Sequence, residues 1–121
     1  MPTRDIPRAE WPAFFDHFSR TRQGRLVLME TVDKEDPHLA ARALPLVGVT
    51  LEVKGSDAGQ IAVQLGTEES DHVTHTIAAP KHVYHKTEKG PMSDEVDHDE
   101  VLEITSDDQP PITYLRFQRP D

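Results

Sequence analysis

The chain has 121 residues, a net charge of −9 and no cysteine. This length supports a single domain, 1–121, with one small core, and the lack of cysteine excludes disulfides, thiol catalysis and thiolate metal sites. The N-terminal dozen residues carry charges and prolines where a signal peptide needs an apolar stretch, and no run is long enough to span a membrane. We therefore expect a cytoplasmic protein without membrane contact.

A helix is predicted over residues 7–23. Its apolar residues recur at helical spacing, Pro12 suits the first turn and Gly24 suits the position after the last. An aromatic binding box is one interpretation of the stripe, but such a stripe ordinarily packs into a core. The pattern favours a helix that covers a sheet, with four aromatic residues facing it: Trp11, Phe14, Phe15 and Phe18.

Alternating patterns predict strands over residues 25–85. Residues 26–32 are apolar on both faces, as in a central strand, whereas residues 47–53 and 61–65 alternate. Residues 101–118 predict a C-terminal hairpin, with a core-facing set of Leu102, Ile104, Leu115 and Phe117. The predicted fold class is α+β, mainly β: an N-terminal helix packed on a small antiparallel barrel or strongly bent sheet of about six strands, similar in layout to Sm and SH3 barrels.

The segment 71–85 holds four of the seven histidines, as His72-x-x-His75 and His82-x-x-His85. Its flanking residues favour strands, in which positions i and i+3 point to opposite sides. If the two runs pair as a hairpin about Ala78 and Ala79, His75 opposes His82, and His72 opposes His85 on the other face. Neither pair then offers the three or four ligands that zinc prefers. The favoured interpretation of His75 is a hydrogen-bonded, partly buried imidazole, and His75 and His82 remain the candidate metal ligands.

An acidic loop is predicted over residues 88–100. From Glu88 to Asp108 nine acids face one base, so this window carries almost all of the net charge. Dense carboxylates suit calcium or magnesium, but the segment lacks the glycine and the ligand alternation of a calcium loop, which favours a solvated loop. The candidate interaction residues are Asp94, Asp97, Asp99 and Glu100.

Catalytic patterns are not evident. The serines lack a nucleophile-elbow context and there is no glycine-rich phosphate loop. Asp71 with His72, or His85 with Glu88, would form an acid–base couple only if the fold brought them together. No cofactor is expected.

Several stretches resemble a small prokaryotic family of uncharacterised proteins, domain of unknown function family 5335. They are MPTRDIPRAEWPAFFDHFSR, ALPLVGVTLEVKG, DHVTHTI and the closing YLRF. The resemblance covers essentially the whole chain and implies a self-contained cytoplasmic domain, without a known activity, cofactor or catalytic residue. The layout is also similar to that of Sm-like barrels, which commonly bind RNA.

The leading functional hypothesis is a non-catalytic protein-interaction module with an unidentified protein partner. The alternative is a metal- or small-ligand-binding protein that uses the histidine segment 72–85. Sm-like RNA binding is a further alternative, disfavoured because phosphate-backbone binding depends on clustered Lys and Arg. The oligomeric state is left open.

Overall fold

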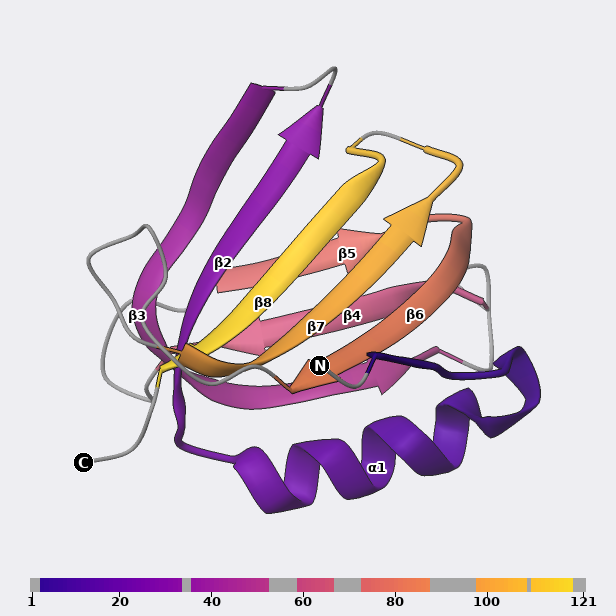
Figure 1. Cartoon of the computed structure of the whole chain (residues 1–121), viewed down its shortest axis with the longest axis horizontal. Helices are drawn as coiled ribbons and strands as arrows, with labels where there is room; N and C mark the ends of the chain where they lie inside the picture. The colour runs from indigo at the N-terminus through magenta and orange to yellow at the C-terminus, as the bar shows by residue number, and fades with distance from the viewer. Residues whose placement is uncertain are drawn as a thin grey trace.

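The computed structural model describes residues 3–33, 36–52, 59–66, 73–87, 98–108 and 110–118, with the side chains of 36–43 and 98–99 left undescribed. Within these residues the chain is mainly β, with one α-helix (Figure 1). In chain order the elements are β1 (Thr3–Asp5), a short 3-10 helix (Arg8–Glu10), α1 (Trp11–Arg22), β2 (Leu26–Asp33), β3 (Asp36–Leu51), β4 (Ile61–Leu65), β5 (Val73–Ile77), β6 (Pro80–Thr87), β7 (His98–Ser106) and β8 (Ile112–Gln118).

The predicted helix is confirmed as α1, which lies across one end of the strands beside β3 (Figure 1). Its aromatic stripe is core: Trp11, Phe15 and Phe18 are buried, and the Trp11 indole donates a hydrogen bond to the Ile6 carbonyl at 2.9 Å. Gly24 follows the last turn with a φ of +88°, a left-handed conformation that glycine adopts without strain. The helix is fixed to β3 by Ser19, whose hydroxyl donates to the Val49 carbonyl at 3.0 Å and accepts from the Val49 amide at 2.9 Å.

The eight described strands form one antiparallel sheet in the order β1-β6-β7-β8-β2-β3-β4-β5. The long strand β3 belongs to both halves: Pro45 and residues before it pair with β2, whereas Leu46 to Leu51 pair with β4. A register shift between Leu46 and Gly48 marks the change of partner. Since β3 passes from one half of the sheet to the other, β4 and β5 lie behind β7 and β8 (Figure 1), and His75 of β5 meets Thr113 of β8 across the layers.

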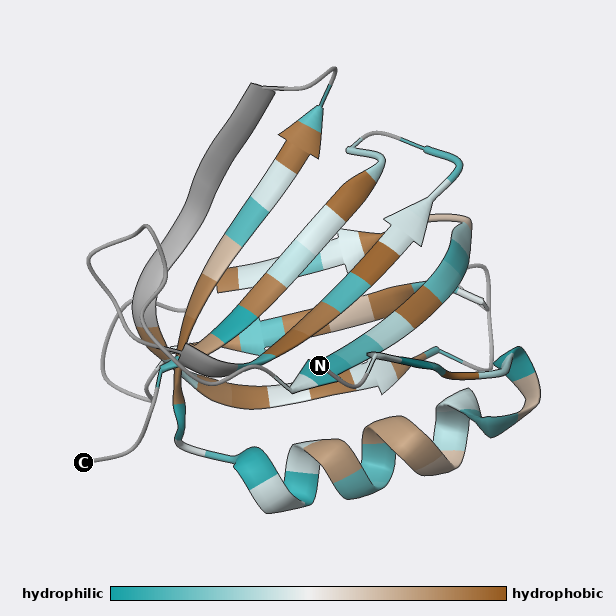
Figure 2. Cartoon of the chain, in the orientation of Figure 1, coloured by the Kyte–Doolittle hydropathy of each residue, from teal (hydrophilic) through white to brown (hydrophobic). Residues whose placement is uncertain are grey.

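The core fills the space between the two halves of the sheet and under α1. Figure 2 shows hydrophobic and hydrophilic positions alternating along β7 and β8, as expected when one face of a strand is buried. Three groups of side chains meet there: Val27 and Met29 from β2; Ile61, Val63, Leu65 and Ile77 from β4 and β5; and Leu102, Ile104, Leu115 and Phe117. The predicted hairpin and its inward-facing residues are therefore confirmed, as is the central position of β2 between β8 and β3.

Two parts of the predicted fold were wrong. Of the two predicted forms, a barrel or a strongly bent sheet, the barrel is wrong because the sheet does not close, and the sheet contains eight strands within the described residues rather than about six. The strand β1 was missed because Thr3–Asp5 is short and exposed, without an apolar alternation. The first half of β3 was missed because residues 36–46 show no regular period of two.

The hairpin about Ala78 and Ala79 does not form. Strand β5 pairs with β4, and β6 pairs with β1 and β7, so His75 does not oppose His82. Ala79 has a φ of +48°, and its carbonyl accepts a hydrogen bond from the Asp107 amide at 3.0 Å, while the Ala78 carbonyl accepts one from the Ser106 hydroxyl. These contacts with the end of β7 direct the chain from the rear half of the sheet to the front half.

Candidate functional site

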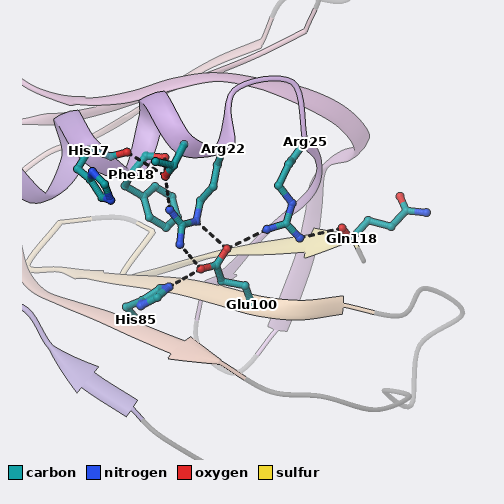
Figure 3. Close-up of polar contacts among 8 residues, drawn as sticks. His17, Phe18, Arg22, Arg25, His85, Glu100 and Gln118 are labelled. Carbon is teal, nitrogen blue, oxygen red and sulfur yellow. Dashed lines mark hydrogen bonds and ion pairs between the residues drawn. The ribbon is translucent and has the colours of Figure 1, made fainter. Parts of the chain in front are cut away.

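A buried carboxylate lies where the end of α1 meets the front half of the sheet (Figure 3). Glu100 of β7 accepts hydrogen bonds from Arg22 at 2.7 and 2.5 Å and from Arg25 at 3.1 Å. His85 of β6 places its Nε2 atom 2.6 Å from Glu100 Oε2, and because an ionised carboxylate only accepts, the imidazole is the donor. We call these four residues the Glu100 cluster.

The register of β6 and β7 explains why His85 and Glu100 meet. His85 is paired with Leu102, and Glu100 lies two residues before Leu102, on the same core-facing side of β7. Such diagonal neighbours are within reach of long side chains. Arg22 arrives from the last turn of α1, and Arg25 from the turn before β2, where it also donates to the Gln118 carbonyl at 3.0 Å.

Aromatic rings surround the charges of the Glu100 cluster. The guanidinium of Arg22 lies 4.2 Å from the centroid of the Phe18 ring, and that of Arg25 lies 5.3 Å from the centroid of Phe117. The His85 ring meets Phe14 and Phe18 edge to face, with centroids 5.9 and 5.8 Å apart. These cation–π and edge contacts partly exclude water and hold the cations in place.

The Glu100 carboxylate stays ionised in this position. Burial by itself raises the pKa of Glu100, but the hydrogen bonds from His85 and Arg22 and the charge of Arg22 outweigh burial and lower the pKa to about 2. Since both carboxylate oxygens already accept hydrogen bonds from these donors, Glu100 is a poor general base. The arrangement instead joins the end of α1 to β6, β7 and β8.

Glu100 therefore does not lie in a solvated acidic loop, contrary to the sequence interpretation. It is 5% exposed and belongs to β7, which begins at His98, so the predicted loop ends earlier than residue 100. Asp94 and Asp97 lie outside the described residues, as does Glu88, and the side chain of Asp99 is not described. A signal in the sequence was available, because Glu100 alternates with Leu102 and Ile104 and therefore falls on the same face of the strand as these two core residues.

The two candidate metal ligands lie in different halves of the sheet. His75 is half-buried, with its Nε2 atom 3.2 Å from Thr113 Oγ1, and burial lowers the pKa of its imidazole. A hydrogen-bonded, partly buried His75 is thus confirmed. His82 is exposed and stacks on Tyr84 with ring centroids 5.7 Å apart. Among the described residues no three His, Asp or Glu side chains group as metal ligands; because His72 lies outside them, metal binding stays a prediction.

A second site was not foreseen: a hollow of about 580 Å³ beside the Ala78–Ala79 turn. Its lining includes Arg8, Gln60, Ala79, Lys81, His82 and Asp107. We call this the basic hollow, because two cations and one imidazole face a single carboxylate. Residues far apart in sequence meet there, and the only sequence signal was the position of His82 beside Lys81.

The basic side chains of the hollow are held to different degrees. Arg8 donates to the Pro80 carbonyl at 2.7 Å, and its guanidinium lies 4.4 Å from the centroid of the Trp11 ring. Lys81 is about half exposed, and its Nζ atom is 3.4 Å from Asp107 Oδ1, a long and solvated ion pair. The hollow therefore combines one fixed cation with one that can move toward a bound group.

Comparisons with known proteins agree with the resemblance seen in the sequence. A sequence model of the family of unknown function (DUF5335) matches residues 2–121. An uncharacterised protein of Aquifex aeolicus (strain VF5) is 31% identical over 94 residues, covering 77% of this chain and 78% of the relative. No solved structure gives a significant match. In the described part of the chain, no helix combines the length and apolar character needed to cross a membrane.

Proposed function

This chain belongs to the family of unknown function DUF5335, whose name assigns no activity, and we propose that it is a non-catalytic protein-interaction domain that receives an acidic group of a partner protein in the basic hollow. One observation carries the proposal. Arg8 and Lys81 lie far apart in sequence, in the segment before α1 and at the start of β6, and they line one concave surface with His82.

The chemistry of these side chains fits a carboxylate. Arginine presents several N–H donors in a planar fork that matches carboxylate geometry, and only one of the Arg8 terminal nitrogens is engaged by Pro80. The Trp11 ring and the Pro80 carbonyl keep this guanidinium in place before a ligand arrives, which reduces the ordering cost of binding. Lys81 adds a mobile cation at the solvent side.

Recognition is favoured over catalysis because the carboxylate and imidazole that lie closest together already have other partners. The closest carboxylate–imidazole pair among the described residues, Glu100 and His85, is engaged by Arg22 and Arg25 in the Glu100 cluster. The described lining residues of the basic hollow include no serine, threonine, cysteine or tyrosine. The charge balance speaks against a nucleic acid, because the chain is acidic in the window Glu88 to Asp108 and close to neutral elsewhere, whereas phosphate-backbone binding depends on clustered Lys and Arg.

The test is a titration of the ¹⁵N-labelled protein with a hexaglutamate peptide, followed by amide chemical shifts. We expect shifts at Gln60, Ala79 and His82, and an affinity that falls as salt is raised. Lys81→Gln should weaken binding by a factor of about 1.5–5, which is the worth of one exposed ion pair. Arg20→Gln is the matched control, because Arg20 is an exposed cation of α1 whose partner is Asp16.

Three results would overturn the proposal. The first is an absence of shifts around the hollow, and the second is an equal loss of affinity in Arg20→Gln. The third is competition by inorganic phosphate at the same concentration as the peptide, which would assign the hollow to a small anion.

A further inference from the structure

We infer that the partner segment bound in the basic hollow carries two opposite charges, with its carboxylate at Arg8 and Lys81 and a neighbouring cationic group at Asp107. This rests on the proposed function and deepens it, because it adds a cationic half to the acidic ligand. Charge complementarity is the basis: among the described residues that line the hollow, Arg8 and Lys81 are cations and Asp107 is an anion.

Asp107 is held beside the hollow by its backbone. Its amide donates to the Ala79 carbonyl at 3.0 Å, and the amide of the next residue, Asp108, donates to Ser106 Oγ at 2.9 Å. The side chain of Asp107 is 65% exposed. The turn between β7 and β8 therefore fixes where this residue lies, while most of its side-chain surface is open to a ligand.

Lys81 is placed near this carboxylate by an irregularity in β6. A register shift between Pro80 and His82 makes Lys81 an extra residue in β6, opposite the end of β7. The ion pair that Lys81 forms with Asp107 is long, at 3.4 Å, and both side chains are at least half exposed. Such a pair contributes little to stability, so a ligand can separate its two members at small cost.

The two cations of the hollow differ in their present partners. Within the described part of the chain, Lys81 has a carboxylate partner in Asp107, whereas Arg8 contacts the uncharged Pro80 carbonyl and Trp11 ring. A carboxylate that enters the hollow therefore gains most at Arg8, which leaves Asp107 for a cation. This difference sets the polarity of the bound segment.

Two kinds of ligand have different effects on the Lys81–Asp107 ion pair. A ligand with carboxylates alone draws Lys81 away and leaves Asp107 beside another negative charge, which repels it. A ligand that also carries a cation gives Asp107 a new partner, so each carboxylate in the hollow faces a positive charge. One exposed ion pair changes an affinity by a factor of about 1.5–5. A segment with both charges therefore fits the hollow better than an acidic segment.

The experiment compares two peptides, capped at both ends, that differ only in their cations: Glu-Lys-Glu-Lys-Glu-Lys and Glu-Gln-Glu-Gln-Glu-Gln. Their affinities are measured from the amide chemical shifts of Gln60, Ala79 and His82 at about 0.15 M salt, where long-range attraction is largely screened. We expect the wild type to bind the lysine peptide more tightly by a factor of about 1.5–5. Asp107→Asn should abolish this preference, because the double-mutant cycle isolates the contact between the peptide lysine and Asp107.

Two further variants serve as controls. Asp16→Asn makes the same change of charge on the exposed surface of α1, where Asp16 pairs with Arg20, and it should keep the preference. Lys81→Gln should weaken the binding of both peptides, as the proposed function requires, and it should also keep the preference because Asp107 remains.

Three results would overturn the inference. The first is an equal affinity of the wild type for the two peptides, and the second is a preference that Asp107→Asn retains or that Asp16→Asn loses to the same extent. In both cases, binding of the peptides at the hollow would leave the proposed function standing. The third is competition by the zwitterion β-alanine at the peptide concentration, which would assign the hollow to a small molecule. An absence of shifts with either peptide would refute the proposed function, and the inference with it.

Discussion

Replacing Glu100 by Gln should destabilise the protein strongly, and the size of the effect follows from its pKa. A carboxyl whose pKa falls from its ordinary value near 4.5 to about 2 on folding stabilises the folded state by about 3 kcal/mol when it is ionised. The amide of Gln keeps the shape but loses the charge, and it removes the carboxylate with which Arg22 and Arg25 form ion pairs at a partly buried site. We expect a loss of about 2–4 kcal/mol in the free energy of unfolding.

The pH dependence supplies the sharper test. Because the folded-state pKa is depressed, the contribution of Glu100 is fully present above its unfolded pKa and is lost as the pH falls toward about 2. Urea unfolding of the wild type and Glu100→Gln should therefore differ most near neutral pH, and the difference should shrink steadily below about pH 4. Glu10→Gln is the control, since Glu10 forms an exposed ion pair with Arg4. A difference that stays constant down to about pH 3 would refute this account of Glu100.

Two further predictions concern the core and the turn. Phe15→Ala should lower the free energy of unfolding by about 3–5 kcal/mol, because the ring is fully buried and its loss leaves a cavity. Thermal or urea unfolding measures this loss. A loss below about 1 kcal/mol would mean that α1 contributes little to the core. Ala79→Gly should stabilise the protein by up to about 1 kcal/mol in the same assay, because residue 79 has a φ of +48°, which glycine adopts without strain. A destabilised variant would show that the Ala79 methyl group has packing contacts that outweigh the strain.

The Glu100 cluster shows how far a local pattern can be taken. Glu100 alternates with Leu102 and Ile104 and so falls on the same face of a strand, but we interpreted it as part of a solvated loop because a run of acids is ordinarily one. Choosing between these interpretations requires partners for a buried charge. Those partners are Arg22 and Arg25, which lie 78 and 75 residues away in sequence.

The sequence by itself determined the elements whose signal lies within one segment. The helix follows from apolar residues at i, i+3, i+4 and i+7, and the hairpin of β7 and β8 follows from two alternating runs joined by a turn, because each pattern needs only one face in contact with a core. The family is likewise visible in the sequence, since the match spans residues 2–121.

Apart from the pairing of β7 with β8, only the tertiary structure decided which strands are neighbours. Two adjacent runs, β5 and β6, could have formed a hairpin, but Ser106 and Asp107 bind the carbonyls of Ala78 and Ala79 and send the chain to the other half of the sheet. The basic hollow exists because of that crossing, since it brings Lys81 and His82 beside Arg8. Periodicity shows that a strand has a buried face, but backbone hydrogen bonds with distant residues determine which strand it joins, and these have no local signature.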